Sequence, residues 1–169
     1  RPEFLENIAA IVKQNVVDIM LVSASNLEAL ADKGVFKKSA VKPAIRANDT
    51  TDIWVGRGAT YSKQASRPFR SASLSRVKKY TDLGLYSITF NNDLDQDYNA
   101  LEHFSAFRED AARNKFNYFL EVFNPNVECG IDPALVPHYI NDSIIRCLAG
   151  VTKADRPQFL KITYNRPKA

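Results

Sequence analysis

The chain has 169 residues, of which 45% are hydrophobic and 25% charged, and its formal net charge is +4. This length and composition are typical of one globular domain and exclude a disordered chain. The small basic excess suits an anionic ligand, but it makes a nucleic-acid-binding protein an unfavoured prediction. No stretch approaches the ~20 apolar residues of a membrane span. We therefore expect one domain over residues 1–169 and no association with a membrane.

Residue types that could hold a metal are few and scattered. Cys129 and Cys147 are too few for a disulfide framework and lack metal-ligand spacing. His103 and His138 are far apart and have no ligand-spaced companion. The sequence therefore predicts no metal and no other cofactor, and it favours a cytoplasmic protein with reduced thiols.

The first half of the chain alternates between helical and strand patterns. Apolar residues at helical spacing predict a helix over Pro2–Gln14. A mostly apolar, β-branched run then predicts a buried strand over 16–22. A capping pattern predicts a helix from Ser25 through Ala31, and a second strand is expected over 41–47. A long segment rich in Gly, Ser, Thr and Arg follows over 48–75.

The second half continues the alternation. Its expected elements are a helix over 74–83 stopped by Gly84, a strand over 85–90, a helix over 95–114, a strand over 118–123, a helix over 137–149 and a strand over 159–164. Such alternation predicts an α/β fold with a parallel sheet and helical crossovers.

The strand ends favour a barrel over an open sheet. The turn after the first strand, 23–26, has no glycine, and the chain has no Gly-Lys-Ser/Thr phosphate loop. Polar side chains follow the strands, as in barrel enzymes, which place their chemistry at the carboxyl ends of strands. An open flavodoxin-like sheet would also place polar groups there, so it stays an alternative.

A complete (βα)8 TIM barrel has eight strands and usually ~250 residues. Five strands are expected here, so we predict an incomplete TIM-barrel-like fold and a chain that is a fragment of a barrel. A five-stranded arc exposes two sheet edges, which another chain would cover. The sequence therefore favours a homo-oligomer.

The order of the strand-end residues resembles the class I, Schiff-base aldolases of the fructose-bisphosphate and deoxyribose-phosphate type. The sixth strand of these barrels carries a lysine in an apolar motif, and 160–164, Leu-Lys-Ile-Thr-Tyr, is similar to it. The earlier strands match the family's second to fifth in order, over 18–21, 42–46, 86–90 and 120–125. The resemblance implies a carbon–carbon lyase that forms an imine on Lys161.

Three departures from the family bear on that implication. The family's first strand, with its acidic residue, is missing, and so are the seventh and eighth strands, with their Gly-rich phosphate turns. Asn124 stands where many members have a tyrosine that acts as general acid. The chain therefore lacks parts that a catalyst would need, and its proton-transfer step is in question.

Lys161 and Glu121 are the candidate catalytic residues. Lys161 lies between apolar neighbours, and burial would favour the neutral amine that attacks a carbonyl group. Glu121 interrupts its strand in the same way and could hold Lys161, take its proton or act as general acid and base. The alternatives are that Lys161 is a structural ion-pair partner of Glu121, and that Glu121 simply reaches solvent.

The candidate substrate-binding residues lie in or after strands. Arg46 could pair with a phosphate or carboxylate, and Lys42, on the same strand face, could be a second cation that favours the neutral form of Lys161. The other candidates are Asn48, Asn91, Asn124 and Tyr164. Surface charges and ordinary turn residues would give the same pattern. The basic segment with Gly56, Arg57 and Gly58 could close over a phosphorylated substrate or, alternatively, hold RNA.

These observations lead to two hypotheses of different classes. The first is an aldolase-like lyase that forms a Schiff base through Lys161 with a small carbonyl or sugar-phosphate substrate. The alternative is a non-catalytic, barrel-derived protein that binds a sugar phosphate or a protein partner.

Overall fold

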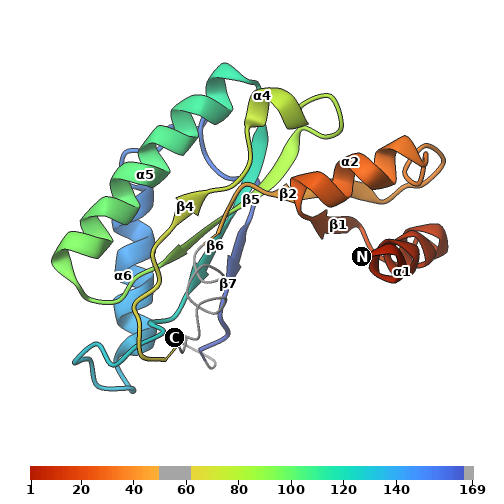
Figure 1. The fold of residues 1–169 in the computed structure, drawn as a ribbon. Helices are drawn as coiled ribbons and strands as arrows, with labels where there is room; N and C mark the ends of the chain where they lie inside the picture. Colours follow the sequence, from red (N-terminus) through yellow and green to blue (C-terminus); the bar gives the residue numbers. More distant parts are fainter. Residues whose placement is uncertain (50–61, 166–169) are drawn as a thin grey trace.

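The computed structural model describes residues 1–49 and 62–165. Its centre is a parallel sheet of five strands in the order β1-β2-β5-β6-β7 (Figure 1). These strands are β1 Ile19–Val22, β2 Lys42–Arg46, β5 Leu83–Thr89, β6 Asn117–Phe123 and β7 Leu160–Ile162. The described helices are α1 Pro2–Gln14, α2 Ala24–Asp32, α4 Leu74–Val77, α5 Leu94–Arg113 and α6 Val136–Leu148. A short antiparallel pair joins β3 Asn48–Asp49 to β4 Phe69–Arg70.

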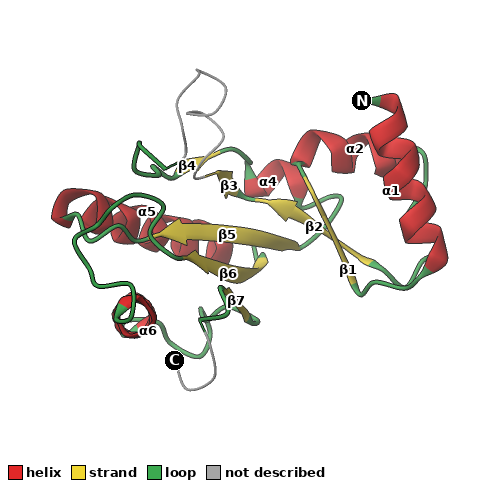
Figure 2. Ribbon diagram, turned by 90° about the horizontal axis from the view of Figure 1, so that it is seen from below, coloured by secondary structure: helices red, strands yellow, loops and turns green. Residues whose placement is uncertain are grey.

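The structure confirms the prediction of an α/β fold with a parallel sheet. Each strand of the sheet lies beside the strand that precedes it in the chain, so the order has no reversal. Figure 2 shows that the sheet is curled, with β1 at a steep angle to β5. An open flavodoxin-like sheet reverses its strand order near the centre. The described part of the chain has no such reversal.

The helices pack against one face of the sheet, which we call the outer face. The core cluster there joins buried residues of the five described helices to alternate residues of the strands, such as Tyr86 and Tyr118. The Phe107 ring of α5 stacks on Tyr86 with centroids 4.4 Å apart, and it meets Tyr118 edge-on at 5.3 Å. Right-handed crossovers between consecutive parallel strands place helices on the same side, which explains this one-sided packing.

The opposite face, which we call the inner face, has a separate and smaller cluster. It consists of strand residues alone, namely Ala44, Leu83, Leu85 and Phe119, packed with Ile19 and Leu21. Successive side chains of a strand point to opposite faces. Residues that lie an even number of positions from a member of this cluster on the same strand therefore share the inner face. Among them are Arg46, Ser87, Thr89, Glu121 and Phe123.

The amino end of β2 accommodates a proline inside the sheet. Lys42 N–H donates to Asp18 O at 2.8 Å, on the β1 side. Pro43 lacks an N–H, but the ladder to β5 begins only at Ile45. The Thr81 hydroxyl donates to Pro43 O at 2.6 Å and accepts from Leu83 N–H at 3.2 Å.

The structure corrects two predicted elements. The strand expected to be buried over 16–22 begins at Ile19, and Val22 is the one buried residue of β1. Val16 and Val17 are exposed because they precede the strand.

The helix expected over 74–83 ends at Val77, and Gly84, expected to stop it, lies inside β5. A Cβ atom at Gly84 would lie 2.9 Å from the Phe116 ring and 3.3 Å from Ile45 O. A residue far along the chain therefore requires glycine here.

None of the described helices is long and apolar enough to cross a membrane.

Candidate functional site

Lys161 and Glu121 lie side by side on the inner face. The register pairs Ser87 of β5 with Glu121 of β6, and Glu121 with Lys161 of β7. These three residues therefore form one row across three neighbouring strands. The row lies toward the carboxyl ends of β5 and β6, two residues beyond the apolar pair of Leu85 and Phe119.

The contacts within this row join all three side chains. Lys161 Nζ donates to Glu121 Oε1 in an ion pair, and Ser87 Oγ donates to Glu121 Oε2 at 2.9 Å. Both carboxylate oxygens are therefore bonded, which is what a buried carboxylate requires. Lys161 Nζ also lies 6.0 Å from the centroid of the Phe123 ring. The Glu121–Lys161 contact is common to the catalytic and the structural interpretations of the sequence.

The expectation that Lys161 is buried is wrong. Its side chain is 59% exposed, whereas that of Glu121 is 4% exposed. The physical reason is the position of β7, which pairs with β6 alone in the part of the chain that the structure describes. Leu160 and Ile162, which flank Lys161 in β7, are also exposed. An apolar run in the sequence indicates a buried strand only when the sheet continues on both sides.

Asn48 holds Ser87 in place through the backbone. Its Nδ2 donates to Ser87 O at 2.8 Å, and its Oδ1 accepts from Ser87 N–H at 2.8 Å. The fully buried amide thus continues the pairing of β2 with β5 beyond the end of β2. These bonds give Asn48 a structural role in the sheet, while its contact with a substrate stays a prediction.

The structure separates the two predicted cations of β2. Arg46 lies on the inner face and donates to Asp49 Oδ1 at 3.0 Å. Lys42 lies at the amino end of the sheet, where its ion pair holds the pKa of Asp82 below its usual value. Ile45 is in register with Gly84, so Lys42, three residues earlier, lies level with residue 81. Six residues of strand separate that level from Ser87, which places Lys42 roughly 20 Å from the row of Ser87, Glu121 and Lys161. Lys42 and Lys161 are therefore not brought together.

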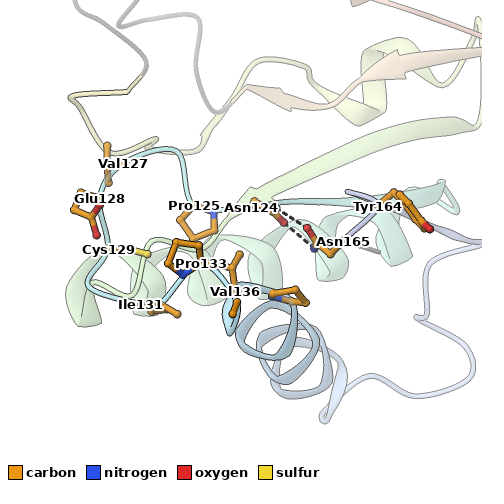
Figure 3. A pocket seen from close by; sticks show the side chains of 12 residues that line it. Asn124, Pro125, Val127, Glu128, Cys129, Ile131, Pro133, Val136, Tyr164 and Asn165 are labelled. Atoms are coloured by element: carbon orange, nitrogen blue, oxygen red, sulfur yellow. Dashed lines mark hydrogen bonds between the residues drawn. The ribbon is translucent and has the colours of Figure 1, made fainter. Parts of the chain in front are cut away.

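Asn124 and Tyr164 line a separate pocket (Figure 3). Its volume is about 590 Å³, and it lies between the ends of β6 and β7 and the start of α6. Asn124 Nδ2 donates to Asn165 Oδ1 at 2.8 Å, and Asn165 Nδ2 donates back to Asn124 Oδ1 at 3.1 Å. Neither Lys161 nor Glu121 lines this pocket. The structure thus divides these predicted site residues among three places: the inner-face row of Lys161 and Glu121, this pocket, and the amino end of the sheet, where Lys42 lies.

Asn91 follows β5 and is 4% exposed. Its Oδ1 accepts from Asn126 N–H at 3.0 Å, so it ties the ends of β5 and β6 together. Within the described ranges its Nδ2 has no hydrogen-bond partner. This donor group is itself buried, and a contact of Asn91 with a substrate stays a prediction.

The basic segment is described only in part. Gly56, Arg57 and Gly58 lie outside the described residues, so a lid or an RNA contact there stays a prediction. Arg70, a basic residue of β4 that follows in the same segment and is described, forms an ion pair with Asp110 of α5.

The sequence did not identify Ser87 or Phe123 as site residues. Serine is common in strands and carries no signal by itself. The register that places Ser87 beside Glu121 depends on contacts between strands and is not encoded in local spacing.

No protein-family model, curated protein or solved structure matches the chain. The site geometry and the resemblance of its strand-end residues are therefore the grounds for a function.

Proposed function

We propose that the protein is an aldolase-like lyase that forms a Schiff base between Lys161 and a small carbonyl or sugar-phosphate substrate. One observation carries the proposal: an accessible lysine contacts a buried carboxylate on the inner face of a parallel sheet. The resemblance of 160–164 to the imine-forming strand of class I aldolases supports it. The proposal includes a fold of TIM-barrel type, which the consecutive strand order and one-sided helices support.

The chemistry assigns one role to each of the two residues. Glu121 accepts a proton from the Lys161 ammonium, and the neutral amine attacks the carbonyl carbon to form a carbinolamine. Glu121 then returns its proton to the carbinolamine hydroxyl, which leaves as water as the C=N bond forms. The protonated imine then accepts the electron pair of the bond between its α and β carbons and becomes an enamine. As this bond breaks, Glu121, again a carboxylate, takes the proton of the β-hydroxyl group, and the β carbon leaves as an aldehyde. Glu121 then protonates the α carbon of the enamine, and water hydrolyses the resulting imine to free Lys161. Ser87 holds the second oxygen of Glu121 throughout.

Reductive trapping tests this proposal. The protein is mixed with glyceraldehyde 3-phosphate, dihydroxyacetone phosphate or pyruvate, reduced with borohydride, and mapped by peptide mass spectrometry. The expected result is one adduct, on Lys161, that is lost in Lys161→Met. Lys42→Met is the matched control, because Lys42 also pairs with a carboxylate and its side chain is 48% exposed. Adducts spread over many lysines, or none on Lys161, would refute imine catalysis.

A second candidate is a non-catalytic protein that binds a sugar phosphate or a protein partner. The observation that favours it is the exposed, ion-paired state of Lys161, which a purely structural lysine on an edge strand would also show. Calorimetric titration with the same phosphates separates the candidates. Binding without any adduct on Lys161 would favour this second function.

A further inference from the structure

The loops at the amino end of the sheet carry a concentrated positive charge. They are the connections that lead into each strand, over 15–18, 33–41, 78–82, 114–116 and 149–159. These loops contain eight lysine and arginine residues against three aspartates, a difference of +5. The described connections at the carboxyl end, over 47–49, 62–73, 90–93 and 124–135, contain three cations against four carboxylates. The fold thus gathers the basic excess of the chain at one end.

The cations of these loops are available to a partner. Seven of the eight are exposed, and none forms an ion pair with a residue that the structure describes. Helix dipoles favour a cation at the carboxyl end of a helix, which accounts for Lys33 directly after α2. Lys37, Lys38, Lys153 and Arg156 lie five or more residues beyond the helix that precedes them, so the dipole does not account for them.

This distribution changes what the net charge indicates. A small excess of +4 spread over the whole chain makes nucleic acid an unfavoured partner. A basic face is the feature by which proteins that bind nucleic acid are identified. Five neighbouring strands extend over roughly 20 Å, so loops along their starts span several phosphates of one nucleic-acid strand.

A pocket of about 350 Å³ lies at the same end of the sheet. Its lining comes from the starts of β2, β5 and β6 and from the residues that precede β7. Phe159 is the aromatic residue of this lining, and its ring stacks on Phe119 with centroids 4.6 Å apart and planes at 15°. The residue is nonetheless 43% exposed. A nucleobase can therefore stack on Phe159 from the side away from Phe119.

Two amide side chains in the same lining offer hydrogen bonds. Gln158 Nε2 donates to Asn117 Oδ1 at 3.3 Å. Gln158 Oε1 and Asn117 Nδ2 make no hydrogen bond to a described residue, and both side chains are exposed. The joined amides thus present an acceptor and a donor side by side, which suits the edge of a base. Asp82, the carboxylate of this lining, is neutralised by its ion pair with Lys42.

We propose that the amino end of the sheet binds single-stranded nucleic acid. The loop cations would contact phosphates, and one base would stack on Phe159 against the amides of Asn117 and Gln158. A base inside a duplex is stacked and paired, so only an unpaired base reaches such a ring. A membrane would meet the same cations and the exposed Val16, but it would leave the ring and the amide pair unused. Leu85 and Phe119 lie between this pocket and the Lys161–Glu121 pair, so this site does not depend on the Schiff base.

Fluorescence anisotropy with labelled oligo(U) and oligo(dT) of about 12 nucleotides tests the proposal. The full chain should bind at least one of them, and the affinity should fall as salt rises. Lys37→Gln/Lys38→Gln should reduce the slope of log K against log salt by about 1.4, because each phosphate contact on a single strand contributes about 0.7. Lys63→Gln/Arg67→Gln is the matched control, since it removes two exposed cations from the carboxyl end. Its slope should equal that of the wild type.

Several results would overturn the proposal. They are the absence of binding to both oligonucleotides, equal changes in the two double variants, or a loss confined to Lys63→Gln/Arg67→Gln, which would place binding on the basic segment instead. Binding to vesicles that contain phosphatidylserine, without binding to either oligonucleotide, would assign the face to a membrane.

A second variant separates base stacking from charge. Phe159→Leu keeps an apolar side chain against Phe119 but removes the aromatic ring. The affinity for the single strand should fall about tenfold, with the salt slope unchanged. Phe159→Trp should keep the affinity of the wild type. An equal affinity in Phe159→Leu and the wild type, or a preference for duplex over single strand, would overturn the base site.

Discussion

The Lys161–Glu121 pair gives the most informative prediction, because its two side chains differ so much in exposure. Lys161→Met would leave the Glu121 carboxylate, 4% exposed, with the Ser87 hydroxyl as its remaining partner. A charged hydrogen bond contributes about 1.5–3 kcal/mol. The 59% exposure of Lys161 lets solvent screen the pair, so we expect a loss of about 1–2 kcal/mol in the free energy of unfolding.

A double-mutant cycle isolates the interaction. Glu121→Gln keeps the shape of the side chain and an acceptor for Ser87, and the double variant removes both charges. Urea unfolding followed by circular dichroism should give a coupling energy of about 1–2 kcal/mol. The same cycle on Lys42 and Asp82, whose side chains are 48% and 40% exposed, should give below about 0.5 kcal/mol. Equal coupling in the two cycles would contradict the argument that Glu121 is held as a buried charge.

Three further predictions concern the rest of the fold. Gly84→Ala should destabilise the protein by about 1–3 kcal/mol in urea unfolding, because its Cβ meets an aromatic ring at 2.9 Å. A hydrogen bond from Arg70 lowers the pKa of Asp110, so its stabilising contribution is present above the ordinary carboxyl pKa of about 4 and is lost as pH falls through the lower folded value. Asp110→Asn should therefore flatten the fall in stability below about pH 4. Burial raises the pKa of Cys147 to about 12, so at pH 8 a thiol reagent should label Cys129 in the native protein and Cys147 only in urea.

The sequence predicted the long elements well because their patterns are local. The helix over Pro2–Gln14 and the strand ending at Phe123 have the expected residues and types. Gly84 was misinterpreted because the Phe116 ring that requires glycine is brought there by the fold. The two-residue strands β3 and β4 are too short to show periodicity.

The candidate site could be predicted only in part, for a related physical reason. A charged residue inside an apolar run is visible in the sequence, so Lys161 and Glu121 could be selected and paired. The exposure of Lys161 depends on whether another strand lies beside β7, which no local pattern records. The contact of Ser87 with Glu121 depends on the register and on a hydrogen bond that only the assembled sheet shows.

The consecutive strand order bears on how the chain folds during synthesis. Each strand pairs with the strand made immediately before it, so β2 can dock on β1 and β5 on β2 as each leaves the ribosome. In a sheet whose strand order reverses, an early strand stays unpaired on one edge until a strand synthesised later pairs with it. Each connection joins strands that are neighbours in the sheet, so no strand pairing has to span the other strands. The row of Ser87, Glu121 and Lys161 would then be the last part of the described sheet to form, when β7 adds to β6.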